Sequence, residues 1–354
     1  MKTSSKLLMG IAAMALSLYA QAYPGEGVAL DPATGDYTIT YRGDPDSTEL
    51  SQTVFVHSTK IAPAIRSSFR LNEKWAIIYR YTVSNGATAK QAIVGVRLDQ
   101  IVNPIVGELS FPDNPVSQAV VDTYNAATKT ALTFPVGWHG NIIRLSSDNL
   151  NRIAWRPNPP MRTGGIPAGR TLTGFGFSSP DLPGVGPSKM DGMGDVLGFP
   201  DEGPVEDSAV FAELKRLRDN NFIARPAAVP TIPIPTPFDP AVVLERIQTH
   251  THTWIAMQLL DPVFSAQLDR YFQSAISAYR LNQPKVGKKH IQTMRELIKK
   301  EQPEADREDD KDDRGEKGDD HDKNKRALID KLAARILDFD LKYVTKRMGG
   351  DRDD

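Results

Sequence analysis

The spacing of apolar side chains differs between the two parts of this chain, and that difference most constrains its fold. In the first part, every second side chain of one run is aromatic or branched; the run consists of Trp75, Ile77, Tyr79, Tyr81 and Val83. A period of two places such side chains on one face of a β-strand. Beyond residue 240 the spacing becomes three or four, as in Val243, Ile247, His250, Trp254 and Met257. That spacing is the period of an amphipathic helix, so the sequence predicts a β-rich first part and a helical second part.

Residues 23–200 contain many short β-prone runs separated by glycine and proline. The run that ends at Val83 is followed by Asn85-Gly86, which favours a hairpin turn because both residues tolerate a positive φ. Residues 92–98 then provide a return strand. Many short strands with turn signals between them are typical of an antiparallel β-sandwich, which we expect over residues 23–200.

The composition changes again over residues 201–240. A short helix is expected first, with its apolar side chains on one face and Ser208 or the residue before it as the cap. Six of the fifteen residues from 226 to 240 are proline. Proline fixes φ and removes a backbone donor, so this stretch predicts a semi-rigid linker and a domain boundary near residue 240. The parts on either side are expected to separate on limited proteolysis.

Residues 241–348 predict helices with narrow apolar faces, each of which needs a neighbour, so an antiparallel helical bundle is expected. A charged insert interrupts it at residues 304–326, with eleven acidic and seven basic side chains and no aliphatic side chain larger than alanine. Such a segment has too little apolar surface to fold and is predicted to be disordered.

The first 22 residues have the organisation of a secretory signal peptide. A lysine-bearing start precedes an apolar run over residues 7–16, and Ala20 and Ala22 supply small side chains at the cleavage positions. The run is shorter than the roughly 20 residues that a membrane-spanning helix needs. We therefore expect export to the periplasm or the exterior, a mature chain that begins at Tyr23, and no membrane span after cleavage.

Composition excludes several classes of function. The chain contains no cysteine, which excludes disulfide frameworks, thiolate metal sites and thiol catalysis. Its 43 basic and 44 acidic side chains give a formal net charge of −1, without the basic excess that nucleic-acid binding proteins usually carry. Nucleic acid is therefore not an expected partner.

Two motifs in the first part resemble those of bacterial exported immunoglobulin-like domains: Y-x-Y-x-V-x-N at residues 79–85 and I-x-x-G-x-x-L-x-G-F at residues 166–175. The C-terminal helices, over residues 262–345, resemble the FIVAR-like helical appendages of secreted bacterial proteins in the segments 269–279 and 329–334. The resemblance implies an immunoglobulin-like β-sandwich followed by a helical domain, and it implies export. It implies no particular activity.

His250 and His252 are the first candidate metal ligands. On a strand they would share a face, but on a helix their side chains lie about 200° apart and cannot hold one ion. The helical spacing around His250 predicts that it packs inward and leaves His252 outside. Copper or zinc binding by His250 together with a carboxylate from elsewhere stays an open alternative.

The charged insert holds the other candidate ligands. Asp310 and Asp312 begin a pattern similar to a calcium-binding loop, but Arg314 occupies a ligand position and His321 stands where the twelfth-position glutamate is needed. No cofactor is therefore expected, and loose association of a divalent cation with the many carboxylates is the alternative.

No catalytic residue can be assigned, because the chain contains neither G-x-S-x-G nor H-E-x-x-H. Trp138, Trp155 and Tyr124 could line a sugar-binding face, although core positions are the favoured interpretation. Two interpretations remain. The favoured one is a non-catalytic exported protein whose sandwich binds an unknown protein or carbohydrate partner. The other is a secreted hydrolase or metal-dependent enzyme with a site built from loops.

Overall fold

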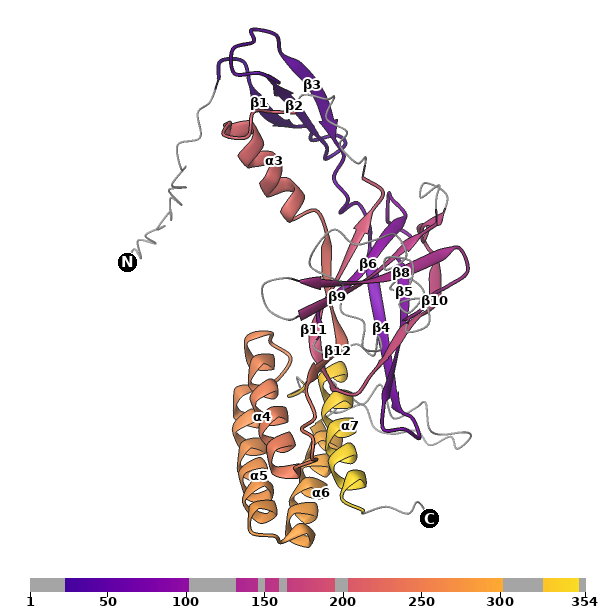
Figure 1. Cartoon of the computed structure of the whole chain (residues 1–354), viewed down its shortest axis with the longest axis vertical. Coiled ribbons are helices and arrows are strands. Elements are labelled where there is room, and N and C mark those ends of the chain that lie inside the picture. The colour runs from indigo at the N-terminus through magenta and orange to yellow at the C-terminus, as the bar shows by residue number, and fades with distance from the viewer. Residues whose placement is uncertain are drawn as a thin grey trace, which may run out of the picture. The chain divides into compact units, whose positions relative to one another are not determined.

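The computed structural model describes residues 23–101, 132–145, 150–158, 164–194, 203–301 and 327–349. These residues form three antiparallel β-sheets and five helices, so the fold is mixed β plus α (Figure 1). The chain divides into two compact units: one comprises residues 1–59 and 194–221, and the other comprises residues 60–193 and 222–354. The signal-like segment 1–22 and the charged insert 304–326 lie outside the described residues.

In its described residues, the first unit has a small sheet and one helix. The sheet has the order β1-β2-β3, with strands Gly27–Leu30, Tyr37–Tyr41 and Ser51–Phe55. Helix α3, Ala209–Asp219, begins after Ser208, whose side chain accepts a hydrogen bond from the backbone N–H of Phe211. The core of this unit is shared by sheet and helix and consists of Ile39, Tyr41, Phe55, Val210, Leu214 and Leu217. The helix expected in this part of the linker, with its apolar face, is thus confirmed.

The second unit contains the two larger sheets. The four-stranded sheet has the order β4-β5-β10-β7, with strands Pro63–Leu71, Ile77–Asn85, Thr171–Ser179 and Leu132–Thr133. The five-stranded sheet has the order β12-β11-β6-β9-β8, with strands Ile223–Ile232, Leu182–Gly192, Ile93–Ile101, Leu150–Pro157 and Trp138–Leu145. All the pairings are antiparallel.

Aromatic rings fill the space between these two sheets. Trp155 of the five-stranded sheet lies 5.7 Å from Phe175 and 6.0 Å from Tyr81 of the four-stranded sheet, measured between ring centroids. The Tyr81 hydroxyl donates to the backbone oxygen of Ala228 at 2.7 Å, so a side chain from one sheet satisfies an acceptor on the other. The period-two run is confirmed from Ile77 to Val83, whose inward side chains are fully buried.

Two local expectations are wrong. Trp75 precedes the strand, in a turn where its φ is 62°, and its ring packs on Tyr343. The expected hairpin at Asn85-Gly86 does not form, because β5 and β6 belong to different sheets. The Asn85 side chain holds this crossing in place: its oxygen accepts from Ala62 N–H, and its nitrogen donates to the backbone oxygens of two other segments.

Four helices follow the sheets, α4 Pro240–Ala256, α5 Pro262–Arg280, α6 Pro284–Glu301 and α7 Lys331–Arg347. Helix α4 contacts α5, α5 contacts α6, α6 contacts α7, and α7 returns to α4 (Figure 1). Aspartate side chains cap three of the helices by accepting from first-turn N–H groups; these are Asp239, Asp261 and Asp330. Among the described residues, no helix combines the length and the apolar character needed to cross a membrane.

The four helices share a core with the two larger sheets. Phe339 of α7 packs edge-on against Phe69 of β4, with 5.0 Å between ring centroids, and Arg335 donates to the backbone oxygen of Ser67 at 3.3 Å. One continuous cluster of buried apolar side chains runs through both sheets and all four helices. The boundary expected near residue 240 therefore falls inside one compact unit.

The linker expected over residues 201–240 is also corrected in part, because residues 223–232 form strand β12. This strand pairs with β11 from the Met190–Ile223 pair to the Leu182–Ile232 pair. It is the outer strand of its sheet, and an outer strand tolerates proline because one side of its backbone makes no ladder hydrogen bonds. Proline density alone therefore did not distinguish an edge strand from a linker.

Candidate functional site

Positive charge is concentrated on two of the four C-terminal helices. Helix α6 carries six basic and two acidic side chains, and α7 carries five basic and two acidic ones. Helices α4 and α5 together carry three basic and two acidic side chains, so they are nearly balanced. We call the solvent-facing side of α6 and α7 the basic face. It exists within a chain whose formal net charge is only −1.

The apolar spacing of α6 determines which of its cations lie next to α7. Ile291, Met294 and Ile298 are buried and turn one side of the helix toward the core. Lys288 and Arg295 lie beside that buried stripe, seven residues or about two turns apart, and both are half-buried. Arg295 forms an ion pair with Asp338 of α7, and this pair links the two helices.

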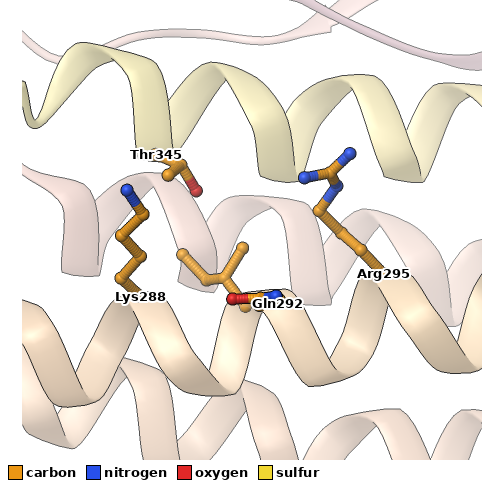
Figure 2. Close-up of a pocket in the computed structure, with 5 residues that line it drawn as sticks. Lys288, Gln292, Arg295 and Thr345 are labelled. Carbon is orange, nitrogen blue, oxygen red and sulfur yellow. The ribbon is translucent and has the colours of Figure 1, made fainter. Parts of the chain in front are cut away.

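A pocket lies between the two helices at this place (Figure 2). It has a volume of about 200 Å³ and is lined by Lys288, Ile291, Gln292, Arg295 and Thr345. Figure 2 shows the Lys288 and Arg295 side chains extending from α6 toward α7 on either side of Gln292. None of these lining side chains is a carboxylate, so the pocket offers a charge environment that favours anions.

Hydrogen bonds determine which lining groups are available. The Nε–H of Arg295 donates to Asp338 Oδ1 at 2.7 Å, and Lys342 Nζ lies 3.5 Å from the other oxygen of that carboxylate. Asp338 therefore orients the guanidinium without occupying its two terminal amino groups. Thr345 donates its hydroxyl hydrogen to the backbone oxygen of Leu341 at 3.0 Å. Thr345 therefore lines the pocket wall but offers no hydrogen-bond donor to a ligand.

The two histidines lie on α4 and point in different directions, as the helical spacing predicted. The His250 ring packs edge-on against Trp254 with 5.7 Å between centroids, and its Nε2 lies 3.4 Å from Thr231 Oγ1. His252 is exposed, and its Nε2 lies 2.8 Å from Asp269 Oδ1. His250 thus belongs to packing between α4 and the sheet, and His252 to a surface pair.

Among the described residues, no third metal ligand lies beside these histidines. Within the described ranges there is no group of three or more histidine, aspartate or glutamate side chains that could hold a metal ion. The other candidate ligands, Asp310 and Asp312, lie outside the described residues. Asp269 is held as well by the Gln248 amide, which donates to its Oδ1 at 2.7 Å.

Burial lowers the pKa of His250 to about 4, and this has a measurable consequence. Because the unfolded-state pKa is 6.5, the unfolded chain gains a proton that the folded chain resists as the pH falls from 6.5 to 4. We expect His250 to lower the free energy of unfolding by about 3 kcal/mol over that interval. Histidine ring-proton NMR should give a midpoint near 4 for His250, and a midpoint near the ordinary value would contradict the packed arrangement.

A second charged cluster lies on the five-stranded sheet. Asp99 of β6 lies 2.5 Å from Arg152 and 2.8 Å from Lys189, so one carboxylate bridges cations from the two neighbouring strands. Asp191 of β11 similarly lies 3.4 Å from Arg97 and 3.8 Å from Arg156. These ion pairs lower the pKa of Asp99 against the opposing effect of its burial. Asp99 is thus paired closely with two bases, whereas Asp191 makes longer ion pairs and its Oδ1 has no hydrogen-bond partner among the described residues. The cluster links neighbouring strands of this sheet.

The aromatic residues considered for a sugar-binding face are core residues where the structure describes them. Trp155 is fully buried and Trp138 is 3% exposed, which excludes both as stacking platforms for a sugar. Tyr124 lies outside the described residues. The favoured core interpretation of the two tryptophans is therefore confirmed.

The sequence analysis missed Lys288 and Arg295. Their signal was present in the spacing of Lys288, Gln292, Arg295 and Lys299, which step by four, three and four beside the buried stripe of α6. The partner helix could not be identified from that spacing, because α7 follows only after the charged insert. Comparison with protein families, with curated proteins and with solved structures gives no match to this chain.

Proposed function

We propose that this chain is an exported, non-catalytic binding protein that engages an anionic partner through the basic face of α6 and α7. In this proposal the two larger sheets form an immunoglobulin-like β-sandwich, and α4–α7 form an antiparallel helical bundle that presents the basic face. The signal-like residues 1–22 and the motifs at residues 79–85 and 166–175 support export and the immunoglobulin-like assignment.

One observation carries the binding proposal: most basic side chains of the C-terminal helices belong to α6 and α7, and Lys288 and Arg295 line a pocket whose lining contains no carboxylate. Charges of one sign on one face create a local potential that attracts an oppositely charged partner, even when the net charge of the molecule is near zero. Such attraction between exposed charges is screened by salt, with a Debye length of about 10 Å at 0.1 M. The proposed binding must therefore weaken as the ionic strength rises.

The proposal predicts retention of the full chain on an immobilised polyanion such as heparin at low salt. Replacing Lys289, Lys299 and Lys300 by glutamine should lower the salt concentration needed for elution, because all three are exposed on α6. The matched control replaces Arg66, Arg70 and Lys74, which are exposed on or beside β4, and removes the same three charges. The control should elute like the unmodified chain.

Two results would contradict the proposal. If the unmodified chain passes through the polyanion column at low salt, the basic face does not bind polyanions. If the two triple variants elute equally early, retention follows net charge rather than the placement of charge on α6. Thermal unfolding of both variants shows whether a shift reflects loss of structure.

A further inference from the structure

The pocket between α6 and α7 is smaller than a site for a whole organic ligand. Ligand pockets usually measure about 300–1,000 Å³, whereas this one measures about 200 Å³. Its floor is closed by Ile291, which is 1% exposed, and by Thr345, which is 7% exposed. A space of this size accommodates one compact group, and the remainder of any larger molecule must stay outside.

The donors around the pocket suit a group with several charged oxygens. Lys288 supplies an ammonium group from one end, and Arg295 supplies the two terminal amino groups of a planar fork from the other. The fork of arginine can bind two oxygens at once, and the combination of arginine with lysine is characteristic of phosphate recognition. The Gln292 side-chain amide lies between them; its nitrogen donates to Glu296 Oε1 at 3.4 Å, and its second amide hydrogen adds a neutral donor.

Asp338 holds the Arg295 guanidinium in place, whereas an isolated cation on the surface would have no such partner. It binds Nε of Arg295 at 2.7 Å from outside the pocket lining, and both side chains are about one-fifth exposed. A guanidinium that is already held in place loses less conformational freedom when it binds an anion. The carboxylate also offsets part of the positive charge, and Lys342, 3.5 Å from its second oxygen, compensates for that.

We propose that the pocket formed by Lys288, Gln292, Arg295 and Thr345 binds a single phosphate group, either free phosphate or the exposed phosphate of a lipid headgroup. The inference rests on the proposed function, because the pocket lies within the basic face. Arg295 binds two phosphate oxygens, Lys288 neutralises the charge from the opposite side, and Gln292 donates to a further oxygen. A carboxylate ligand, with two oxygens, would leave one end of the pocket without an acceptor.

Calorimetric titration of the full chain with inorganic phosphate, at constant ionic strength maintained with chloride, tests the site directly. Arg295→Gln and Lys288→Gln should each weaken binding by roughly tenfold or more, since hydrogen bonds to charged groups contribute the corresponding free energy. Arg295→Lys should recover only part of the affinity, because an ammonium group lacks the fork. Arg270→Gln, exposed on α5 and outside the basic face, is the matched control and should bind like the unmodified chain.

A vesicle arm identifies the source of the phosphate. The full chain is mixed with neutral phosphatidylcholine vesicles that contain either phosphatidic acid or the same amount of oleate, which supplies charge without phosphate. A headgroup ligand predicts stronger binding to the phosphatidic acid vesicles and its loss in Arg295→Gln. Free phosphate as the ligand predicts calorimetric binding with no preference between the two vesicles.

The failures of the two proposals are distinguishable. Polyanion retention that depends on Lys289, Lys299 and Lys300, together with no phosphate binding in either arm, would overturn the pocket assignment and leave the basic face standing. Phosphate binding that is unchanged in Arg295→Gln and Lys288→Gln would also overturn the pocket. Absence of both polyanion retention and phosphate binding would overturn both proposals.

Discussion

Replacing Asp340 with asparagine is expected to stabilise the full chain by about 2–4 kcal/mol at pH 7, because the carboxyl ionises freely in the unfolded chain but must stay protonated or carry an unpaired charge when buried. Asp340 lies in α7, is fully buried, and neither of its carboxylate oxygens has a hydrogen-bond partner within the described part of the chain. Burial raises its pKa well above the ordinary value of 3.8. Burial, followed by the charges of Tyr81 and Asp340, also raises the pKa of the Tyr79 phenol of β5.

The sign of the pH dependence follows from the raised pKa of Asp340. Below pH 3.8 the Asp340 carboxyl is protonated in both the folded and the unfolded chain, so it costs no stability. As the pH rises above 3.8, the unfolded chain ionises while the folded chain stays protonated, so the free energy of unfolding falls until the pH reaches the folded-state pKa. Urea unfolding between pH 5 and 8 should show a smaller fall in stability for Asp340→Asn than for the unmodified chain. Asp338→Asn, on the same helix but in an ion pair whose side chains are about one-fifth exposed, is the control. Equal slopes, or a less stable Asp340→Asn at pH 7, would contradict this account.

Replacing Trp155 with alanine is expected to lower the free energy of unfolding by about 3–5 kcal/mol, the usual cost of removing a large buried aromatic side chain. Trp155 is fully buried and contacts three rings of the opposite sheet, those of Tyr81, Phe175 and Phe177. Trp155→Phe keeps a ring in the same place and should be destabilised less. The variant therefore measures the aromatic packing between the two sheets.

The same variant tests whether sheets and helices unfold together. With Trp75 and Trp138 also replaced by phenylalanine, Trp254 of α4 is the one tryptophan left in both Trp155→Ala and Trp155→Phe, so the fluorescence of these two chains reports on the helices. One shared core predicts that the Trp254 signal and the sheet signal in circular dichroism shift to lower urea by the same amount. A helical transition that stays at its original urea concentration would support instead the separable parts expected from the sequence.

Periodicity alone was sufficient to predict the elements that have one buried face and one exposed face. The strand at residues 77–83, the buried face of α3 and the opposite directions of His250 and His252 all followed from spacing. In each case a single element determines which side chains turn inward. No knowledge of its neighbours in the fold was needed.

Features that depend on the neighbouring element could not be predicted. Strand β12 resembled a linker because its prolines are tolerated only through its position at the sheet edge. The Asn85-Gly86 signal indicated a hairpin, but the bonds from the Asn85 side chain to distant backbone groups direct the chain to the other sheet. The phosphate pocket likewise needs Arg295 and Thr345 from helices separated by the charged insert.

Hydrogen exchange of the full chain with and without a soluble polyanion tests the central proposal most directly, because it locates the bound surface on the protein. Binding through the basic face predicts slower exchange confined to residues 284–301 and 331–347, with α4, α5 and both larger sheets unchanged. The added protection should disappear at high salt. Protection that maps to the sheets, or binding that leaves α6 and α7 unprotected, would contradict the proposal that these two helices form the binding surface.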